Sequence, residues 1–258
     1  MIKYSLIRYL GVDTAVLSSD KPPENETAIM IGEAVSASNL LFLFPSLKAD
    51  TGVIAYKNGK EQTEELPFGA LASIGAYLTR LRGLPWRSLS IEAKCGIADY
   101  CGISSKGDLF TEKPIKCKQL LSNKLINVNN CDISVDIIES TSPYAVIKAD
   151  DVSCVDGKTL RAVMAEVGDD VTGTIAVDAK RSYASAKQLL NSDTALCGVI
   201  AAAAFYISRE ARHFSDNIVT LEGTEYFYSS RYDCVSVFDR PDISVKVLSD
   251  AYGYNSFL

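Results

Sequence analysis

A cysteine followed by a glycine, Cys197-Gly198, stands directly before a run of small and apolar residues, VIAAAAFYIS. A thiolate at the start of a helix is stabilised by the helix dipole and by free backbone N–H groups, which lowers the pKa of the thiol below its free value of about 8.5. Such a thiolate can take a proton from a carbon atom beside a carboxylate. A cysteine next to four alanines is equally typical of a buried core, because free cysteine is among the most buried residue types. Both interpretations are open at this point.

Other polar residues could complete or exclude a reactive site. Asp193 lies just before Cys197, where an aspartate commonly caps a helix and could also act as an acid–base group. Asn58 precedes Gly59, and Asn-Gly is a strong signal for a tight hairpin turn. His213 is the single histidine of the chain, and the seven cysteines form no CxxC pair. The sequence therefore predicts no metal site, and free thiols in a reducing compartment are the simplest interpretation.

The elements that must position these residues are of two kinds. Two segments are small and apolar at helical spacing, and we expect a helix over 68–80 and another over 198–211. The remaining apolar runs alternate like strands or hairpins, and they span 39–46, 50–61, 88–110, 172–179, 183–190 and 217–239. A helix that is apolar nearly all round is buried on all sides, so each helix is expected to lie inside a sheet.

The two halves of the chain repeat the same order of elements. Gly69 and Leu89 are twenty positions apart, and so are Gly198 and Ile218. Two copies indicate an internal duplication. We expect an α+β fold with two pseudo-symmetric domains, each an antiparallel or mixed β-sheet wrapped round a central helix.

The expected domain boundaries follow from this duplication. The first domain spans 1–113 and the second spans 114–247, and a final strand near 248–258 is expected to return to the first domain. Because pockets favour domain interfaces, we expect a cleft between the domains with both helix N-termini directed into it, where backbone N–H groups favour a carboxylate.

Charge and hydropathy exclude some classes of protein. The formal net charge is −6, whereas binding of nucleic acid needs clustered Lys and Arg. No apolar run approaches the roughly 20 residues that span a bilayer. The N-terminal residues MIKYSLIRYLG read as a first strand rather than a signal peptide. We therefore expect a cytoplasmic protein that binds neither nucleic acid nor a membrane.

Several segments together resemble a known superfamily. EELPFGALASIGAYL resembles an active-site segment of diaminopimelate epimerase and of the phenazine-biosynthesis isomerases, and SDTALCGVIAAAA resembles the second active-site segment of the epimerase. RYLGVDTAVL, ASNLLFLFPSLKADTGVIAYKNG and LEGTEYFYSSRYDCVSVFDRPDISVKV resemble its opening, P-S and closing regions, in the same order. Over nearly its whole length the chain resembles the diaminopimelate epimerase-like superfamily, which also includes proline racemase.

The resemblance implies the two-domain fold and a cofactor-independent isomerase, racemase or epimerase that acts on a small carboxylate or amino acid, within amino-acid metabolism. In the family two cysteines move the α-proton. Cys197 matches the second cysteine and is expected to be one catalytic acid–base group, with Asp193 as a further catalytic candidate by analogy with the isomerases. The first cysteine is replaced by Pro67 in the epimerase register and by Gly69 in the isomerase register.

The substrate-binding positions implied by the resemblance are Asn58, Gly69, Ser142 and Gly198. We expect Asn58, Gly69, Ser142 and Cys197 to line one pocket between the domains. The segment Ser142-Pro143-Tyr144 stands where the family has N-P-H, so the substrate contacts differ from those of diaminopimelate epimerase. No cofactor is expected, and a homodimer is compatible with the resemblance.

The loss of one base favours a competing interpretation. A catalytically degenerate member of the superfamily would act as a metabolite-binding or protein-interaction module. A one-base isomerase, in which the same group moves a proton along the substrate, is also open.

Overall fold

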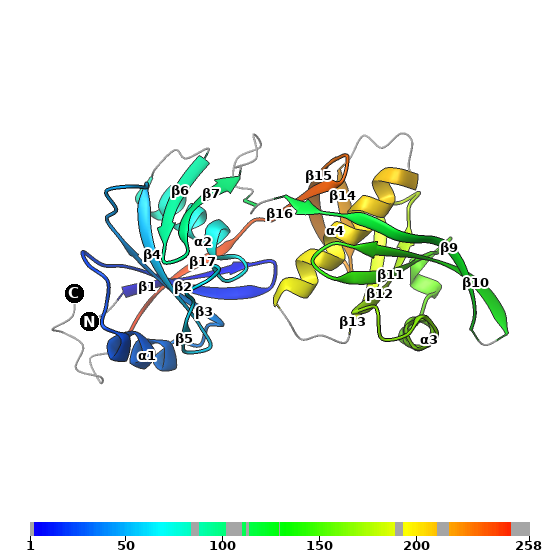
Figure 1. The fold of residues 1–258 in the computed structure, drawn as a ribbon, viewed down its shortest axis with the longest axis horizontal. Coiled ribbons are helices and arrows are strands. Elements are labelled where there is room, and N and C mark those ends of the chain that lie inside the picture. Colours follow the sequence, from blue (N-terminus) through cyan, green and yellow to red (C-terminus); the bar gives the residue numbers. More distant parts are fainter. Residues whose placement is uncertain are drawn as a thin grey trace. The chain divides into compact units, whose positions relative to one another are not determined.

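The computed structural model describes residues 3–83, 88–101, 110–111, 114–128, 130–188, 193–210 and 217–248. Contacts divide the chain into two compact units (Figure 1): unit 1 contains residues 1–113 and 239–258, and unit 2 contains residues 114–238. The strand that pairs back onto unit 1 is β17 (Asp242–Val247), which lies within the range that the sequence assigns to the second domain. We expected the returning strand near 248–258, and of this range residues 249–258 lie outside the described residues.

Unit 1 is built on a mixed sheet of eight strands in the order β17-β1-β2-β3-β4-β6-β7, with β5 paired to β4. Besides β17, its strands are β1 (Lys3–Tyr9), β2 (Val12–Ser18), β3 (Asn39–Phe44), β4 (Thr51–Lys57), β5 (Lys60–Glu61), β6 (Ser88–Ala93) and β7 (Gly96–Cys101). The predicted strands over 39–46, 50–61 and 88–110 are confirmed within the described residues.

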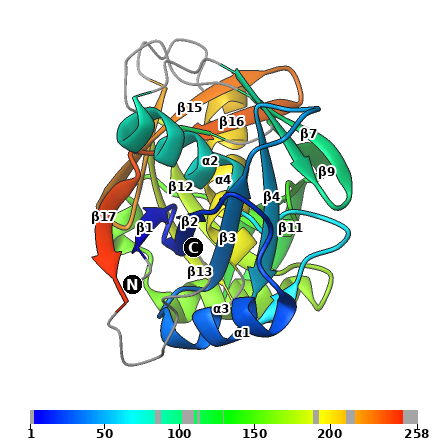
Figure 2. The same cartoon turned by 90° about the vertical axis from the view of Figure 1, so that its left-hand side faces the viewer.

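Two helices cover opposite faces of this sheet (Figure 2). The helix α1 (Asn25–Ala34) packs in a cluster with Ala15 of β2 and Phe42 of β3. The helix α2 (Ala70–Ala76) continues as a π-helical segment, η1 (Tyr77–Leu81), and every residue of α2 is buried. The helix predicted over 68–80 is therefore confirmed. Its small side chains allow the strands of the sheet to approach it closely.

The turn between β4 and β5 is the predicted Asn-Gly turn. Asn58 has a φ of 51° and Gly59 a φ of 75°, and Lys57 pairs with Lys60 across them. Two consecutive positive φ angles are required by a type I′ turn, which asparagine and glycine adopt with the least strain.

Unit 2 is built on a sheet of nine strands in the order β8-β16-β15-β14-β13-β12-β11-β10-β9. They are β8 (Ile115–Lys116), β9 (Lys118–Val128), β10 (Cys131–Glu139), β11 (Pro143–Lys148), β12 (Gly173–Asp178), β13 (Tyr183–Gln188), β14 (Ile218–Leu221), β15 (Thr224–Arg231) and β16 (Cys234–Phe238). The predicted strands over 172–179, 183–190 and 217–239 are confirmed within the described residues, whereas β8 to β11 were not predicted from the sequence.

The helices of unit 2 are a short 3₁₀ helix, η2 (Val152–Cys154), and two α-helices, α3 (Gly157–Val167) and α4 (Asp193–Glu210). On α3 the buried residues recur at helical spacing and pack on the sheet: Leu160, Val163, Met164 and Val167. The central helix α4 is buried on all sides from Cys197 to Ile207. The sheet therefore wraps round α4, as the all-apolar segment 198–211 predicted.

The duplication is visible in the strand pairing of the two units. In unit 1, β1–β2 is antiparallel, β2–β3 parallel, β3–β4 antiparallel, β4–β6 parallel and β6–β7 antiparallel. The series from β10 to β15 in unit 2 follows the same pattern. Each parallel connection passes through a helix, first α1 or α3 and then α2 or α4. The two units thus repeat one topology.

The N-cap of α3 leads to a first testable effect. Asp156 accepts the backbone N–H of Thr159 at 2.7 Å, and this hydrogen bond lowers the pKa of the Asp156 carboxyl below its ordinary value of 3.8. Asp156→Ala should lower the midpoint of thermal unfolding at neutral pH. Because the pKa is depressed by folding, the stabilisation is present above the unfolded-state pKa and is lost as the pH falls through the folded-state pKa.

The difference in thermal midpoint between Asp156→Ala and the wild type should therefore shrink toward about pH 2. Circular dichroism at several pH values measures it. Asp156→Asn, which keeps a side-chain acceptor, is the matched control. A difference that is the same at every pH would show that the carboxylate is not the source of the stability.

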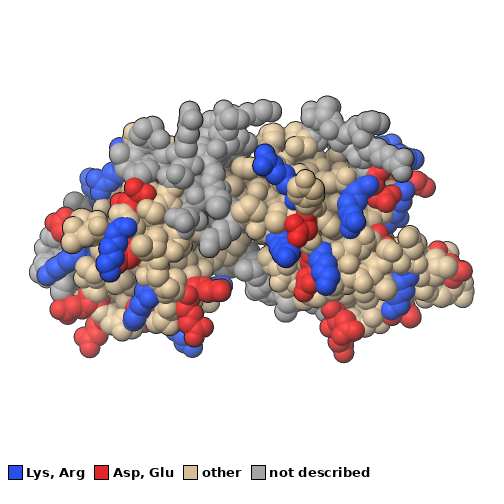
Figure 3. Space-filling model, turned by 45° about the horizontal axis from the view of Figure 1, so that its top comes forward, with Lys and Arg blue, Asp and Glu red and all other residues tan. Residues whose placement is uncertain are grey.

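Charges of both signs mix on the surface. On the face drawn in Figure 3, Lys and Arg side chains alternate with Asp and Glu rather than forming one basic patch, in keeping with the net charge of −6. Among the described residues, no helix has the length and apolar character needed to cross a membrane.

Candidate functional site

Cys197 lies further inside its helix than the sequence predicts. The helix α4 begins at Asp193, so Cys197 is its fifth residue, and the side chain is 5% exposed. In a regular helix the N–H of the fifth residue already donates to a carbonyl one turn earlier, and the effect of the helix dipole falls off after the first turn. The predicted helix start at 198 is therefore wrong. The backbone N–H of Cys197 is therefore not one of the free N–H groups of the helix start.

The loop between β10 and β11 closes over the first turns of α4. Ser140 Oγ donates a hydrogen bond to the carbonyl of Gly198 at 2.9 Å. A Cβ atom added to Gly198 would overlap Thr141 Oγ1 and would lie 2.8 Å from the hydroxyl of Tyr144. The absence of a side chain at Gly198 therefore allows these hydroxyl groups to approach the backbone beside Cys197.

Tyr144 belongs to a buried hydroxyl network. Its side chain is 1% exposed, and its hydroxyl forms hydrogen bonds with Thr141 and Thr172. Burial raises the pKa of Tyr144, the two threonine hydrogen bonds lower it, and the nearby Cys197 raises it again. The phenol is therefore neutral at ordinary pH and lies within electrostatic reach of the Cys197 thiol. The sequence did not predict this network, although the hydroxyl-rich run STSPY (140–144) was visible in it.

For Ser142 and Asp193, the other predicted residues of unit 2, the structure gives mainly the position of the backbone. The carbonyl of Ser142 accepts the N–H of Ser140 at 3.0 Å, which closes the loop, and Ser142 is half-buried. Asp193 is the first residue of α4, and its side chain lies outside the described residues. The structure therefore brings Cys197, Gly198 and the loop of Ser142 together within unit 2.

Two predicted residues lie in unit 1. Gly69 has a φ of 77° and directly precedes α2, where its carbonyl accepts the N–H of Ser73 at 2.8 Å. This positive φ favours glycine at that position. Asn58 is exposed at the β4–β5 turn, where its positive φ serves the turn. A pocket shared by Asn58, Gly69, Ser142 and Cys197 stays a prediction.

The side chain of a buried asparagine on β3, which the sequence analysis did not single out, contacts the backbone just before α2. Asn39 is 1% exposed, and its Nδ2 donates to the carbonyl of Phe68 at 3.2 Å and to Thr14 Oγ1 at 3.4 Å. Its position at the first residue of β3 places a polar group beside the backbone that leads into Gly69. In unit 2, β12 corresponds to β3 and begins with Gly173 where β3 begins with Asn39. The residue paired with Gly173 is Tyr144 of β11, just as Thr14 of β2 is paired with Asn39.

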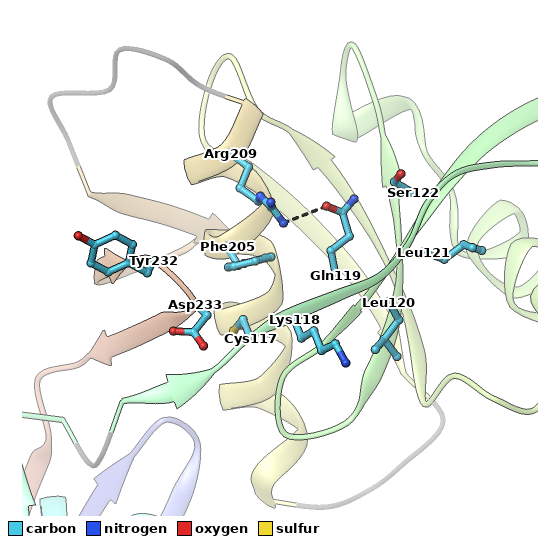
Figure 4. A pocket seen from close by; sticks show the side chains of 10 residues that line it. All are labelled: Cys117, Lys118, Gln119, Leu120, Leu121, Ser122, Phe205, Arg209, Tyr232 and Asp233. Atoms are coloured by element: carbon cyan, nitrogen blue, oxygen red, sulfur yellow. Dashed lines mark hydrogen bonds between the residues drawn. The ribbon is translucent and has the colours of Figure 1, made fainter.

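A surface pocket of about 630 Å³ lies on unit 2, between β9 and the C-terminal half of α4, where Phe205 and Arg209 line it (Figure 4). Arg209 of α4 donates a hydrogen bond to Gln119 of β9 at 2.9 Å, and Tyr232 and Asp233 come from the β15–β16 turn. Arg209 lies twelve positions after Cys197 on α4, which is about 18 Å along the helix axis. Cys117, which also lines this pocket, contacts the carbonyl of Ala201, one helical turn after Cys197.

The thiol in this pocket is not suited to proton transfer. Cys117 is fully buried, and its sulfur lies 3.8 Å from the carbonyl of Ala201. Burial, followed by the nearby Cys234 and Asp233, raises the pKa of Cys117 to about 12. The thiol therefore stays protonated at ordinary pH, and Cys197 is the better candidate. No group of three or more His, Cys, Asp or Glu within the described residues is arranged to hold a metal ion.

The fold matches solved structures at low sequence identity. A phenazine biosynthesis protein of the PhzF family from Enterococcus faecalis is 12% identical, with a TM-score of 0.60 over 96% of this chain and 99% of that chain. A PhzC/PhzF protein from Clostridium difficile strain 630 is 10% identical, with a TM-score of 0.60 over 96% and 100%. Methylitaconate-delta-isomerase is 10% identical, with a TM-score of 0.51 over 95% of each chain.

No protein-family model and no curated protein sequence matches the chain. The likeness at 10–12% identity concerns the fold, and it extends over nearly the full length of each solved structure. The duplicated topology, with a helix inside each sheet, is therefore that of a known architecture: the chain has the diaminopimelate epimerase-like fold.

Proposed function

We propose that the protein is a cytosolic, cofactor-independent isomerase of the racemase or epimerase type, which acts on a small carboxylate or amino acid with Cys197 as one acid–base group. The observation that carries this proposal is the surroundings of Cys197. Its thiol is next to a glycine that a hydroxyl-bearing loop contacts directly, on the central helix of unit 2. The fold is shared with a methylitaconate isomerase, which supports the class of reaction.

The proposed chemistry begins with the Cys197 thiolate. The thiolate takes a proton from the carbon next to the substrate carboxylate and becomes a thiol, while the electron pair of the C–H bond passes into the carboxylate or a neighbouring unsaturated group. Backbone N–H groups in the first turn of α4, including that of Asp193, would bind the substrate carboxylate. Gly198 and Ser142 would border the same site, with Asn58 and Gly69 contributed by unit 1.

The return of the proton decides the type of isomerase. In the first active-site segment Pro67 and Gly69 occupy the positions of the family's first cysteine, and neither carries an acid–base side chain. A single thiol can return the proton to a different carbon of the delocalised anion, which moves a double bond and regenerates the thiolate. Cys197 alone fits a one-base proton shift, whereas a two-base racemisation or epimerisation would use Asp193 as the candidate second acid–base group.

Exchange of substrate protons with solvent tests the proposal without knowledge of the product. The protein is incubated in D₂O with a panel of amino acids and small saturated and unsaturated carboxylates, and loss of the proton next to the carboxylate is followed by NMR. We expect exchange with at least one compound. Cys197→Ser should slow it by at least about a hundredfold, because positioned acid–base groups contribute 10²–10⁴-fold.

Cys131→Ser is the matched control, since Cys131 is exposed on the β9–β10 hairpin. It should exchange protons at the wild-type rate. Exchange that persists in Cys197→Ser would remove Cys197 from the mechanism. Absence of exchange with every compound would favour the metabolite-binding or protein-interaction module instead.

A further inference from the structure

A second pocket of unit 2 lies beside the last two turns of α4. Its volume is about 440 Å³, which is within the range of pockets that hold small molecules. Tyr206, Arg209 and Glu210 line it from α4, and β9, β10 and β11 supply the other walls. These three residues are spaced three and four positions apart, so they share one face of the helix. Tyr206 lies nine positions after Cys197, about 13.5 Å along the helix axis.

The hydroxyl of Tyr206 is a hydrogen-bond donor that the protein leaves unused. Tyr206 is 7% exposed, and its hydroxyl has no hydrogen-bond partner among the described residues. Burial, followed by the charges of Glu210 and Asp136, raises the pKa of Tyr206 to about 12, so the phenol keeps its hydrogen at ordinary pH. Both carboxylates line the same pocket, which puts the hydroxyl on the pocket side of the ring. A buried polar group without a partner is destabilising, and a ligand in the pocket would satisfy it.

The pocket also contains one negative and one positive side chain that lack an ion pair. Asp136 of β10 accepts the backbone N–H of Asn123 with Oδ1 at 2.7 Å, at a bulge in the pairing of β9 with β10. Arg209 donates to the neutral amide of Gln119 at 2.9 Å, as Figure 4 shows. Neither Asp136 nor Arg209 makes an ion pair with a described residue. Asp136 Oδ2 and part of the guanidinium group are therefore available to a ligand.

These two charges select a ligand that carries both signs. The other charged pair of the pocket, Lys148 and Glu210, lies 3.3 Å apart and neutralises itself. A simple anion would be repelled by Asp136, and a simple cation by Arg209. A free amino acid at neutral pH carries an ammonium group and a carboxylate on one carbon atom. Its ammonium group can donate to a carboxylate, and its own carboxylate can accept from a guanidinium and a phenol.

We propose that this pocket is a second binding site, which takes a free α-amino acid as a zwitterion: Arg209 and the Tyr206 hydroxyl bind its carboxylate, and Asp136 binds its ammonium group. The site is additional to the proposed catalytic one, since neither Cys197 nor Ser142 lines the pocket. It therefore stands or falls independently of the reaction at Cys197.

Calorimetric titration of the full chain tests the site. The standard amino acids are first compared near neutral pH by the rise that each produces in the midpoint of thermal unfolding, because a ligand of the folded state raises it. The amino acid with the largest rise is then titrated, and we expect it to bind. Its deaminated carboxylic acid and its decarboxylated amine should each bind at least about tenfold more weakly, because each loses one charge-assisted contact. Equal affinity for the carboxylic acid alone would contradict the proposal.

Two variants locate the ligand. Asp136→Asn keeps an oxygen for the backbone N–H of Asn123 and removes the negative charge. It should weaken binding of the amino acid at least about tenfold and should not weaken binding of the deaminated acid. Tyr206→Phe removes one oxygen and keeps the ring, and it should weaken binding of both compounds about tenfold. The unfolding transition of each variant without ligand shows that it is folded.

Tyr228→Phe is the matched control. Tyr228 is also a buried tyrosine of unit 2, 4% exposed, but it lies on β15 and its hydroxyl bonds with Ser208 outside this pocket. This variant should bind the amino acid with wild-type affinity. Two results would overturn the proposal: no amino acid stabilises the protein, or both Asp136→Asn and Tyr206→Phe bind as the wild type does. In the second case the amino acid occupies another site.

Discussion

Gly198→Ala should destabilise the protein by about 3 kcal/mol, because overpacking of a filled core costs up to roughly that amount. The added Cβ would overlap Thr141 Oγ1, and Tyr144 and Ser140 leave no space in which it could turn away. The loop from Ser140 to Ser142 would have to move off α4, and the hydrogen bond from Ser140 to the Gly198 carbonyl would be lost. Urea unfolding followed by circular dichroism measures the change in the free energy of unfolding.

Gly32→Ala is the control for this substitution. Gly32 also lies in a helix, α1, but a Cβ there would meet Leu40 Cδ2 at 3.6 Å, which is an ordinary contact. Alanine in a helix is favoured over glycine, so this variant should gain about 0.5–1 kcal/mol. Adding Thr141→Ala to Gly198→Ala should recover part of the lost stability. Wild-type stability of Gly198→Ala would show that the loop does not press on the helix.

Cys117 should be alkylated more than a thousandfold more slowly than Cys131 in the folded protein at pH 8. Its pKa of about 12 leaves roughly one molecule in ten thousand as thiolate at that pH, whereas a free thiol with a pKa of about 8.5 is roughly one-quarter ionised. Burial of the Cys117 sulfur slows the reaction further. Mass spectrometry of peptides after a short exposure to iodoacetamide gives both rates in one sample, and unfolding in urea should remove the difference.

The same raised pKa makes the fold sensitive to alkali. The stability that the neutral Cys117 thiol contributes is fully present below the unfolded-state pKa of about 8.5, and it is lost as the pH rises through about 12. Equal labelling of Cys117 and Cys131 in the folded protein would mean that the pocket beside Arg209 opens to admit the reagent. The assignment of Cys197 as the better candidate would then need revision.

The sequence predicted the features that depend on local chemistry. The dipeptide Asn58-Gly59 predicted the β4–β5 turn, because asparagine and glycine adopt the positive φ angles of that turn with little strain. The central helices followed from their small apolar side chains, and the order of strands after each helix predicted the duplication. The outer helices α1 and α3 were missed, although Leu160, Val163, Met164 and Val167 of α3 recur at helical spacing; on α1 the exposed Ile29 and Met30 obscure the apolar face.

The candidate site was predicted only in part, because some of its residues are far apart in the sequence and meet only in the folded chain. Cys197 and Gly198 were reached through one short motif. Tyr144 of β11 lies beside Gly198, and Thr172 reaches Tyr144 because it directly precedes β12, which pairs in parallel with β11. No spacing in the sequence encodes that meeting. The start of α4 was misplaced because a glycine after a cysteine resembles a helix boundary. The residues before it continue the helix to Asp193.

The pairing of β17 with β1 has a consequence for the order of folding during synthesis. Unit 2 is one continuous stretch, 114–238, so its whole sheet can form as soon as that stretch has left the ribosome. In unit 1, the partner of Lys3–Arg8 is Asp242–Val247, which is translated after all of unit 2. One side of β1 therefore stays unpaired while the second half of the chain is made, and an unpaired strand edge invites association between nascent chains. Unit 2, although it follows most of unit 1 in the sequence, can therefore complete its sheet before unit 1 does.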